Sequence, residues 1–208
     1  MDFLKAIKQA KEKAKPRKFN QTFDLVINLK GLDLKKPENR INKEFILPEG
    51  RGKEQKVVLI SNSATPEDKK LVDLVIDKAK LEKLGENKKE AKKIANEYDW
   101  FLAEASLMPL VGKNLGPILA PRGKMPKPIP PNAKLQIFVE NAKKSVRIRV
   151  KTTPVIQVPV GTEKQEEEKV AKNAEAIYNF IKELLPKKEL NIKSIFIKLT
   201  MGPAIKVE

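Results

Sequence analysis

The segment TFDLVINLK, residues 22–30, decides the fold class of the regions around it. Phe23, Leu25, Ile27 and Leu29 alternate with residues that are mostly polar. In an extended chain, alternate side chains point to opposite faces, so one face here is apolar and the other mainly polar. This alternation is typical of a half-buried strand in an antiparallel sheet, and we predict one here, packed on helices.

The same period of two returns elsewhere in the chain. It predicts further strands at 43–48, 146–151, 154–160 and 193–200. Two helices accompany them. Residues 2–15 carry apolar side chains at helical spacing among lysines, and residues 163–185 follow a capping box formed by Thr162 and Gln165.

The middle of the chain has a different hydrophobic pattern, with continuous apolar runs in place of alternation. VVLIS (57–61) and WFLAEA (100–105) are apolar runs that predict strands buried on both faces. Between them, the sequence predicts a helix from Pro66 to Lys80, capped by Thr65, and a second over 88–96. Strand, helix, helix and strand in this order indicate an open α/β sheet.

Residues 109–131 carry seven prolines and three glycines, which favours a stiff loop. A helix over 133–144, capped by Asn132, is expected to follow.

Two styles of sequence therefore coexist, and we predict two domains. Residues 1–52 and 146–208 share a pattern that neither flank completes alone, so together they are expected to form an α+β domain of two layers, with two helices on one sheet. Residues 53–145 then form an α/β domain inserted into it.

The charge of the chain limits its partners. Lysine and arginine exceed the acids to give a net charge of +16, which favours a polyanion: nucleic acid first, an anionic membrane second. A solvated lysine-rich surface, as in thermophilic proteins, is the alternative. No run of eighteen apolar residues is present, so no membrane span is expected. The apolar stripe of residues 2–15 is narrow and half alanine, which favours packing on the chain's own domain, so no membrane partner is expected either.

The absence of histidine and cysteine removes cysteine nucleophiles, histidine bases and the usual zinc sites. It also fits a reducing, cytoplasmic location. The carboxylates of Asp24, Asp99 and Glu104 do not have the spacing of a metal or acid–base site. We expect no catalytic residue, metal or cofactor. A Mg²⁺-dependent nuclease and a general RNA chaperone stay open as alternatives.

The polar faces of the predicted terminal strands suggest where RNA would bind, because hydroxyls and amides pair with 2′-hydroxyls and base edges, while lysine and arginine contact phosphate. The side chains on these faces are Thr22, Asp24, Asn28 and Lys30; Arg147, Arg149 and Lys151; and Ser194, Phe196, Lys198 and Thr200. An ordinary solvated sheet face is the alternative.

The TMGP stretch at 200–203 interrupts the last strand just before the end of the sequence. Gly202 would let a ribose-phosphate approach closely, and Met201 would lie on a sugar or base. Taken alone, the stretch is also explained by a simple turn.

Four motifs then carry a resemblance. LGPILAPRGKMPKP (115–128), KFNQTFDLVINLKGLD (18–33), LPEGRGK (47–53) and TMGP resemble segments of the ribosomal protein L-one family, in the same order along the chain. The short N-terminus and the LKG insertion resemble the archaeal branch of that family.

The resemblance implies an inserted domain that is Rossmann-like, and binding to large-subunit ribosomal RNA at the mobile stalk. It also implies assistance in the release of deacylated tRNA from the exit site, and repression of translation by binding the protein's own messenger RNA. A monomer off the ribosome and a cytoplasmic, ribosomal location are expected.

Carried over by position, the RNA contacts of the family fall at the first strand and the last: Lys18, Phe19, Thr22 and Asp24, with Ser194, Thr200, Met201 and Gly202. Arg51, Arg122 and Lys124 are weaker candidates. Pattern alone would place Phe19 in the core. Asp24 stands where bacterial members carry an acid longer by one carbon.

Overall fold

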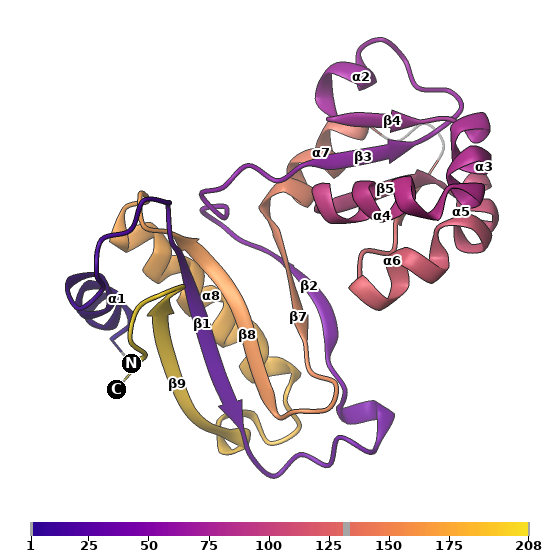
Figure 1. The fold of residues 1–208 in the computed structure, drawn as a ribbon. Coiled ribbons are helices and arrows are strands. Elements are labelled where there is room, and N and C mark those ends of the chain that lie inside the picture. Colours follow the sequence, from indigo (N-terminus) through magenta and orange to yellow (C-terminus); the bar gives the residue numbers. More distant parts are fainter. Residues whose placement is uncertain (1, 131–133, 208) are drawn as a thin grey trace. The chain divides into compact units, whose positions relative to one another are not determined.

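The computed structural model describes residues 2–130 and 134–207 (Figure 1). The chain divides into two compact units. Unit 1 comprises Met1–Lys53 and Lys144–Glu208, and unit 2 comprises Glu54–Lys143. Helices and several sheets occur together, which confirms the mixed α/β class predicted from the sequence.

Unit 1 contains one sheet of four strands, in the order β10-β9-β1-β8, with antiparallel neighbours. Its elements are α1 (Phe3–Glu12), β1 (Thr22–Leu29), η1 (Pro37–Asn39), β2 (Asn42–Ile46), β7 (Ser145–Arg149), β8 (Val155–Thr162), α8 (Glu167–Leu184), η3 (Lys188–Asn191), β9 (Ile192–Leu199) and β10 (Ile205–Lys206). Helices α1 and α8 lie on one side of the sheet formed by β9, β1 and β8 (Figure 1).

The core of unit 1 follows the predicted alternation. Phe23, Leu25, Ile27 and Leu29 of β1 are buried against the two helices, whereas the alternate residues of β1 are only partly buried. Burying side chains of this size contributes about 1.5–3 kcal/mol each. The predicted strand at 22–30 is confirmed.

The expectation of a single sheet in the terminal regions is wrong. Strands β2 and β7 pair only with each other, as a separate antiparallel ribbon. Arg147 of β7 contacts Glu44 of β2 at 3.5 Å. The side chains of Arg147, Arg149 and Lys151 therefore do not belong to the sheet that carries Thr22 and Ser194, because a period of two does not specify which strand pairs with which.

Two boundaries in unit 1 also differ from prediction. The N–H of Thr162 donates to Oε1 of Gln165, and the N–H of Gln165 donates to the carbonyl of Thr162. These bonds close a turn, and α8 begins after it, at Glu167. At the other end, β9 stops at Leu199, and the chain turns to form β10, which the sequence did not predict.

Unit 2 is built around a parallel sheet in the order β4-β3-β5-β6. Its elements are β3 (Val57–Ile60), α2 (Asp68–Leu71), β4 (Leu74–Ile76), α3 (Lys78–Glu86), α4 (Lys88–Glu97), β5 (Trp100–Glu104), η2 (Ala105–Leu107), α5 (Met108–Asn114), α6 (Gly116–Arg122), β6 (Lys127–Ile129) and α7 (Leu135–Lys144). Every residue of β3 is buried, because helices cover both faces of the sheet. The predicted strands at 57–61 and 100–105 are confirmed.

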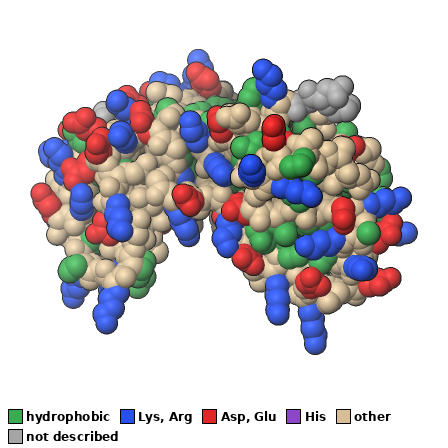
Figure 2. Space-filling view, turned by 90° about the horizontal axis from the view of Figure 1, so that it is seen from above, with side chains coloured by type: hydrophobic (Ala, Val, Ile, Leu, Met, Phe, Trp, Pro, Cys, Tyr) green, Lys and Arg blue, Asp and Glu red, His purple; other side chains and the backbone are tan. Residues whose placement is uncertain are grey.

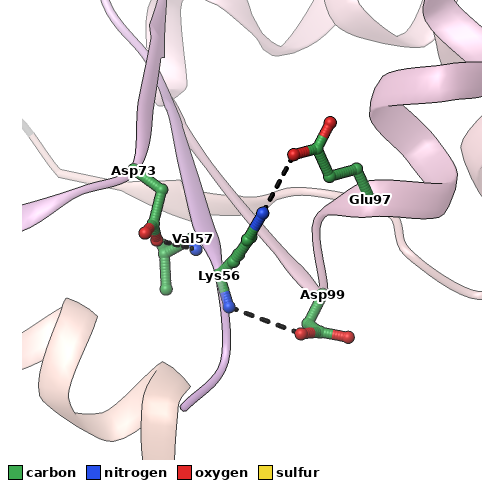
Figure 3. A network of polar contacts seen from close by, with 5 residues as sticks. All are labelled: Lys56, Val57, Asp73, Glu97 and Asp99. Atoms are coloured by element: carbon green, nitrogen blue, oxygen red, sulfur yellow. Dashed lines mark hydrogen bonds and ion pairs between the residues drawn. The ribbon is translucent and has the colours of Figure 1, made fainter.

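The single helix predicted from Pro66 to Lys80 is wrong. The segment instead forms α2, the strand β4 and the start of α3. The carboxylate of Asp73 accepts the N–H of Val57 at 2.7 Å (Figure 3). The N–H of Asp73 also donates to the carbonyl of Val57. Leu74–Ile76 then pair in parallel with β3. Pairing with β3 overrides the local helical propensity of a short apolar run.

The stiff loop expected at 109–131 is also wrong over most of its length. It contains α5, α6 and β6. Pro109 and Pro117 lie in the first turns of α5 and α6, where no helical hydrogen bond is lost. The helix predicted at 133–144 is confirmed as α7, and the predicted cap, Asn132, lies outside the described residues.

Candidate nucleic-acid interface

The side of the unit 1 sheet that faces away from α1 and α8 carries the predicted polar residues. We call it the β1–β9 face. It consists of Thr22, Asp24, Val26 and Asn28 of β1 and Ser194, Phe196 and Lys198 of β9, and we include the turn that borders it at one end, Thr200, Met201 and Gly202. On neighbouring strands, Asp24 lies opposite Lys198, Val26 opposite Phe196, and Asn28 opposite Ser194.

One end of this face is fixed by Thr22 and Thr200. The backbone N–H of Thr200 donates to the carbonyl of Thr22 at 3.0 Å. The hydroxyl of Thr200 accepts the N–H of Thr22 and donates to its carbonyl, each at 3.2 Å. Thr200 thus continues the pairing of the two strands beyond the end of β9, and the turn that follows starts from a fixed point.

The turn itself presents Met201 to solvent. Its side chain is 58% exposed, although its N–H donates to Oε1 of Gln21 at 3.1 Å. The N–H of Gly202 donates to the carbonyl of Leu199 at 2.9 Å. A side chain on Gly202 would point inward, since its Cβ would lie 3.2 Å from Cβ of Leu199 and 3.4 Å from Cβ of Ala14. Glycine at 202 therefore serves close packing of the turn on unit 1.

Asp24 is the acidic group of the face. Partial burial raises the pKa of its carboxyl above the ordinary value, while the positive charges of Lys198 and Arg51 oppose that rise. Lys198 also donates from Nζ to the carbonyl of Thr200 at 3.0 Å. Asp24 is thus placed among cations on a face that is otherwise neutral or basic.

Arg51, a weaker candidate, lies in the turn after β2. It stands between Gly50 and Gly52, whose φ angles of 67° and 72° favour glycine. Nε of Arg51 is buried and finds no hydrogen-bond partner among the described residues. The positive charge of Arg51 lowers the pKa of Asp24. The predicted LPEGRGK turn therefore contributes to the electrostatic environment of the β1–β9 face.

The other end of the face is formed by Asn28 and Ser194, joined by a bond of 2.9 Å from Nδ2 of Asn28 to Oγ of Ser194. Asn28 lies four residue steps along the strand from Asp24, or about 13 Å at ~3.3 Å per residue. The half-buried pair of Val26 and Phe196 lies between them and is not part of the core beneath. The face therefore has two polar ends and an apolar centre.

Lys18 and Phe19 precede β1 and are both exposed. Phe19 is 52% exposed, so the core position suggested by its type alone is wrong. Gln21, two residues further on, is the residue that accepts the N–H of Met201. Sequence reasoning missed Gln21, because nothing in KFNQTF distinguishes a buried glutamine from an exposed one.

Arg122 and Lys124 lie in unit 2, where their side chains bond to other parts of the unit. Lys124 donates from Nζ to the carbonyls of Ala95 and Tyr98, at 2.9 and 2.6 Å, and so caps the end of α4. Arg122 donates to the side chain of Asn96 and to the carbonyl of Ile118. Both residues have a structural role, and contact with RNA stays a prediction for them.

Positive charge does not gather in one patch on the side of the molecule that Figure 2 shows. On the side of the molecule in Figure 2, lysine and arginine side chains are spread over the surface with acids among them. Within residues 2–130 and 134–207, no group of three or more acidic, histidine or cysteine side chains is arranged to hold a metal ion. None of the helices described is long and apolar enough to cross a membrane.

Comparison with known proteins supports the resemblance seen in the motifs. "Large ribosomal subunit protein uL1" of Methanothermococcus thermolithotrophicus is 50% identical over 210 residues, covering 100% of this chain and 98% of its own. The proteins of the same name from Thermococcus kodakarensis and Methanocaldococcus jannaschii are 48% and 47% identical, each covering 99% of this chain, with 96% and 94% of their own lengths. All three sources are archaeal, as expected.

The family described as "Ribosomal protein L1p/L10e family" matches residues 7–203. This span contains all four motifs, the whole β1–β9 face, all of unit 2 and most of unit 1. The predicted family is confirmed: the chain belongs to the ribosomal protein L1p/L10e family.

Proposed function

We propose that this protein is a structural, non-enzymatic component of the large ribosomal subunit in the cytoplasm, where it binds large-subunit ribosomal RNA at the mobile stalk. The names of its full-length relatives support the subunit, and the net charge of +16 suits an RNA partner. Unit 1 is the RNA-binding α+β domain in this proposal, and unit 2 is a Rossmann-like insertion.

One observation supports the site of binding: Thr22 and Thr200 are bonded together beside an exposed methionine. Side chains from the two ends of the sequence thus form one preformed surface. Lys18, Phe19, Thr22, Asp24, Ser194, Thr200, Met201 and Gly202 contact the RNA in this proposal.

The mechanism is recognition of RNA shape. Hydroxyls and backbone groups at the two polar ends of the face contact riboses and phosphates in a defined arrangement, and Met201 packs on a sugar or base. Lysines and arginines elsewhere supply an attraction that depends on salt and not on sequence. Specific affinity should therefore depend on a few residues of the face, and non-specific affinity on net charge.

A pair of variants tests this proposal. Met201→Ala removes an exposed apolar side chain, and Lys8→Ala removes one exposed charge from α1. In competition between large-subunit ribosomal RNA and an unrelated RNA, we expect Met201→Ala to lower the affinity for the first about tenfold and to leave the second unchanged. Lys8→Ala should weaken both slightly. Equal losses in the two variants would contradict a compact recognition face.

A second role as a translational repressor uses the same face in our proposal, with the protein's own messenger RNA presenting a similar structure. The messenger should then compete with ribosomal RNA, and Met201→Ala should weaken both by the same factor. Undiminished binding of the messenger by this variant would require a different site.

Assistance in releasing deacylated tRNA completes the proposal and is tested on ribosomes. Subunits lacking the protein should release deacylated tRNA more slowly from the exit site, and adding the purified protein, a monomer in solution, should restore the rate. The alternative of a Mg²⁺-dependent nuclease predicts RNA cleavage that a chelator stops, whereas binding alone leaves the RNA intact.

A further inference from the structure

Gln21 is a buried polar residue with an unusual balance of hydrogen bonds. Its side chain belongs to a residue only 1% exposed. Oε1 accepts the N–H of Met201 at 3.1 Å, and the backbone carbonyl accepts the N–H of Glu163 at 2.9 Å. The amide nitrogen Nε2 is buried and has no hydrogen-bond partner in the described part of the chain.

The unpaired amide nitrogen of Gln21 lowers the stability of the folded protein. A buried donor without a partner costs free energy that is similar to or larger than the net gain from the bond that Oε1 makes. A residue chosen only for the stability of unit 1 would not keep such a group. A local arrangement that costs stability is expected where function requires a particular geometry.

Gln21 bonds to the backbone of Met201, the exposed residue of the turn after β9. Thr200 fixes the residue before Met201 through its bonds to Thr22, and Gln21 fixes the backbone of Met201 itself. The two attachments come from adjacent positions, Gln21 and Thr22, at the start of β1. Without the second attachment, the backbone at Met201 would be held only through its neighbours in the turn, so the direction of its exposed side chain would be less defined.

We propose that Gln21 is a positioning residue for RNA recognition, which acts by holding the backbone of Met201 so that its side chain is presented to the RNA in one orientation. The proposal rests on the proposed function, since it assigns to Gln21 a role in that same site. Gln21 itself does not contact the RNA. Its contribution is to reduce the loss of conformational freedom that the turn would otherwise undergo on binding.

The first test uses matched substitutions. Gln21→Met keeps the length of the side chain and removes the acceptor. Gln55→Met makes the same change at another buried glutamine, which accepts a bond from Nε1 of Trp100 in unit 2. We expect Gln21→Met to raise the dissociation constant for large-subunit ribosomal RNA about five- to tenfold, and Gln55→Met to raise it less than twofold.

A double-mutant cycle separates positioning from general stability. If Gln21 acts through Met201, then Gln21→Met should change the dissociation constant less than twofold in a Met201→Ala background. A further five- to tenfold loss in that background would overturn the proposal, because Gln21 would then act independently of Met201.

Hydrogen exchange on the unmodified protein covers the case in which Gln21→Met fails to fold. The amide of Met201 should be protected in the free protein to about the same degree as that of Gly202, whose bond lies within the turn. Free exchange at Met201 would overturn the proposal. Failure of the proposed function looks different: the unmodified protein would then show no preference for large-subunit ribosomal RNA, whatever the state of Met201.

Discussion

Thr22 and Thr200 are 178 positions apart in the sequence and are joined by three hydrogen bonds. Two of them use the Thr200 hydroxyl, which serves as acceptor and donor at once. This relationship brings the beginning of β1 and the turn after β9 into one surface. It is the physical basis for our proposal that segments from distant parts of the sequence form a single RNA-binding face.

The first prediction concerns that hydroxyl. Thr200→Val keeps the shape of the side chain and removes both of its bonds, leaving the N–H of Thr22 without its acceptor. We expect a loss of about 1–2 kcal/mol in the free energy of unfolding, and at least a tenfold weaker binding of large-subunit ribosomal RNA. Urea unfolding and filter binding measure the two effects. Thr200→Ser, which keeps the hydroxyl, is the control and should behave nearly as the unmodified protein.

The second prediction concerns pH. Burial raises the pKa of Asp24 above its ordinary value of 3.8, so the folded protein holds this proton more tightly than the unfolded chain does. The contribution of Asp24 to the free energy of unfolding therefore falls as pH rises from 3.8 through the folded-state pKa, and is constant above it. Asp24→Asn should be more stable than the unmodified protein at pH 7, by a margin that shrinks as pH is lowered through this window towards 3.8.

Urea unfolding of both proteins at several pH values between 3 and 7 measures this margin. A less stable Asp24→Asn variant at pH 7 would mean that attraction to Lys198 and Arg51 outweighs the cost of burial. Lys198→Met then provides a check, since removing that cation should raise the pKa of Asp24 further and widen the margin.

The third prediction separates two reasons for glycine at 202. Packing is one reason, because a Cβ would lie 3.2 Å from Cβ of Leu199, which is tight enough that the turn must shift by a few tenths of an ångström. Gly202→Ala should therefore lower the free energy of unfolding by about 1 kcal/mol and weaken RNA binding as the turn shifts. If this variant binds RNA weakly but unfolds as the unmodified protein does, then glycine is needed for the close approach of RNA, as the sequence first suggested.

The fourth prediction concerns unit 2. Lys124→Met leaves the carbonyls of Ala95 and Tyr98 without their charged donor, which should cost unit 2 about 1.5–3 kcal/mol in thermal or urea unfolding. Lys113→Met, at an exposed position in the last turn of α5, removes the same charge and should cost little. Both should weaken RNA binding equally. A much larger loss of affinity with Lys124→Met in protein that is still folded would make Lys124 an RNA contact.

Much of this architecture is predictable from local pattern. The alternation in 22–30 identified β1 and its buried face, and the apolar runs at 57–61 and 100–105 identified the strands of the parallel sheet. Ordered motifs identified the family. Each of these features is visible within a short window of sequence, because a side chain's neighbours along the chain decide which face it occupies.

The predictions that were wrong concern features that depend on contacts between segments distant in the sequence. Leu74–Ile76 form a strand because they pair with β3 and because Asp73 bonds to Val57 at the start of β3. Strands β2 and β7 pair with each other and not with the four-stranded sheet of unit 1. The pairing of β2 with β7 joins segments about a hundred residues apart, and the formation of β4 depends on pairing with β3. The local sequence of a segment does not specify which distant strand it will pair with.

The sequence by itself therefore determined the class of fold, the family and the types of side chain available for the proposed RNA contact, since composition, periodicity and motifs are properties of the chain. Only the tertiary structure decided that Gln21 and Thr22 meet Met201 and Thr200. Hydrogen bonds are directional and short, so their partners are chosen by how distant strands come into register, and that choice is made by the packing of the whole of unit 1.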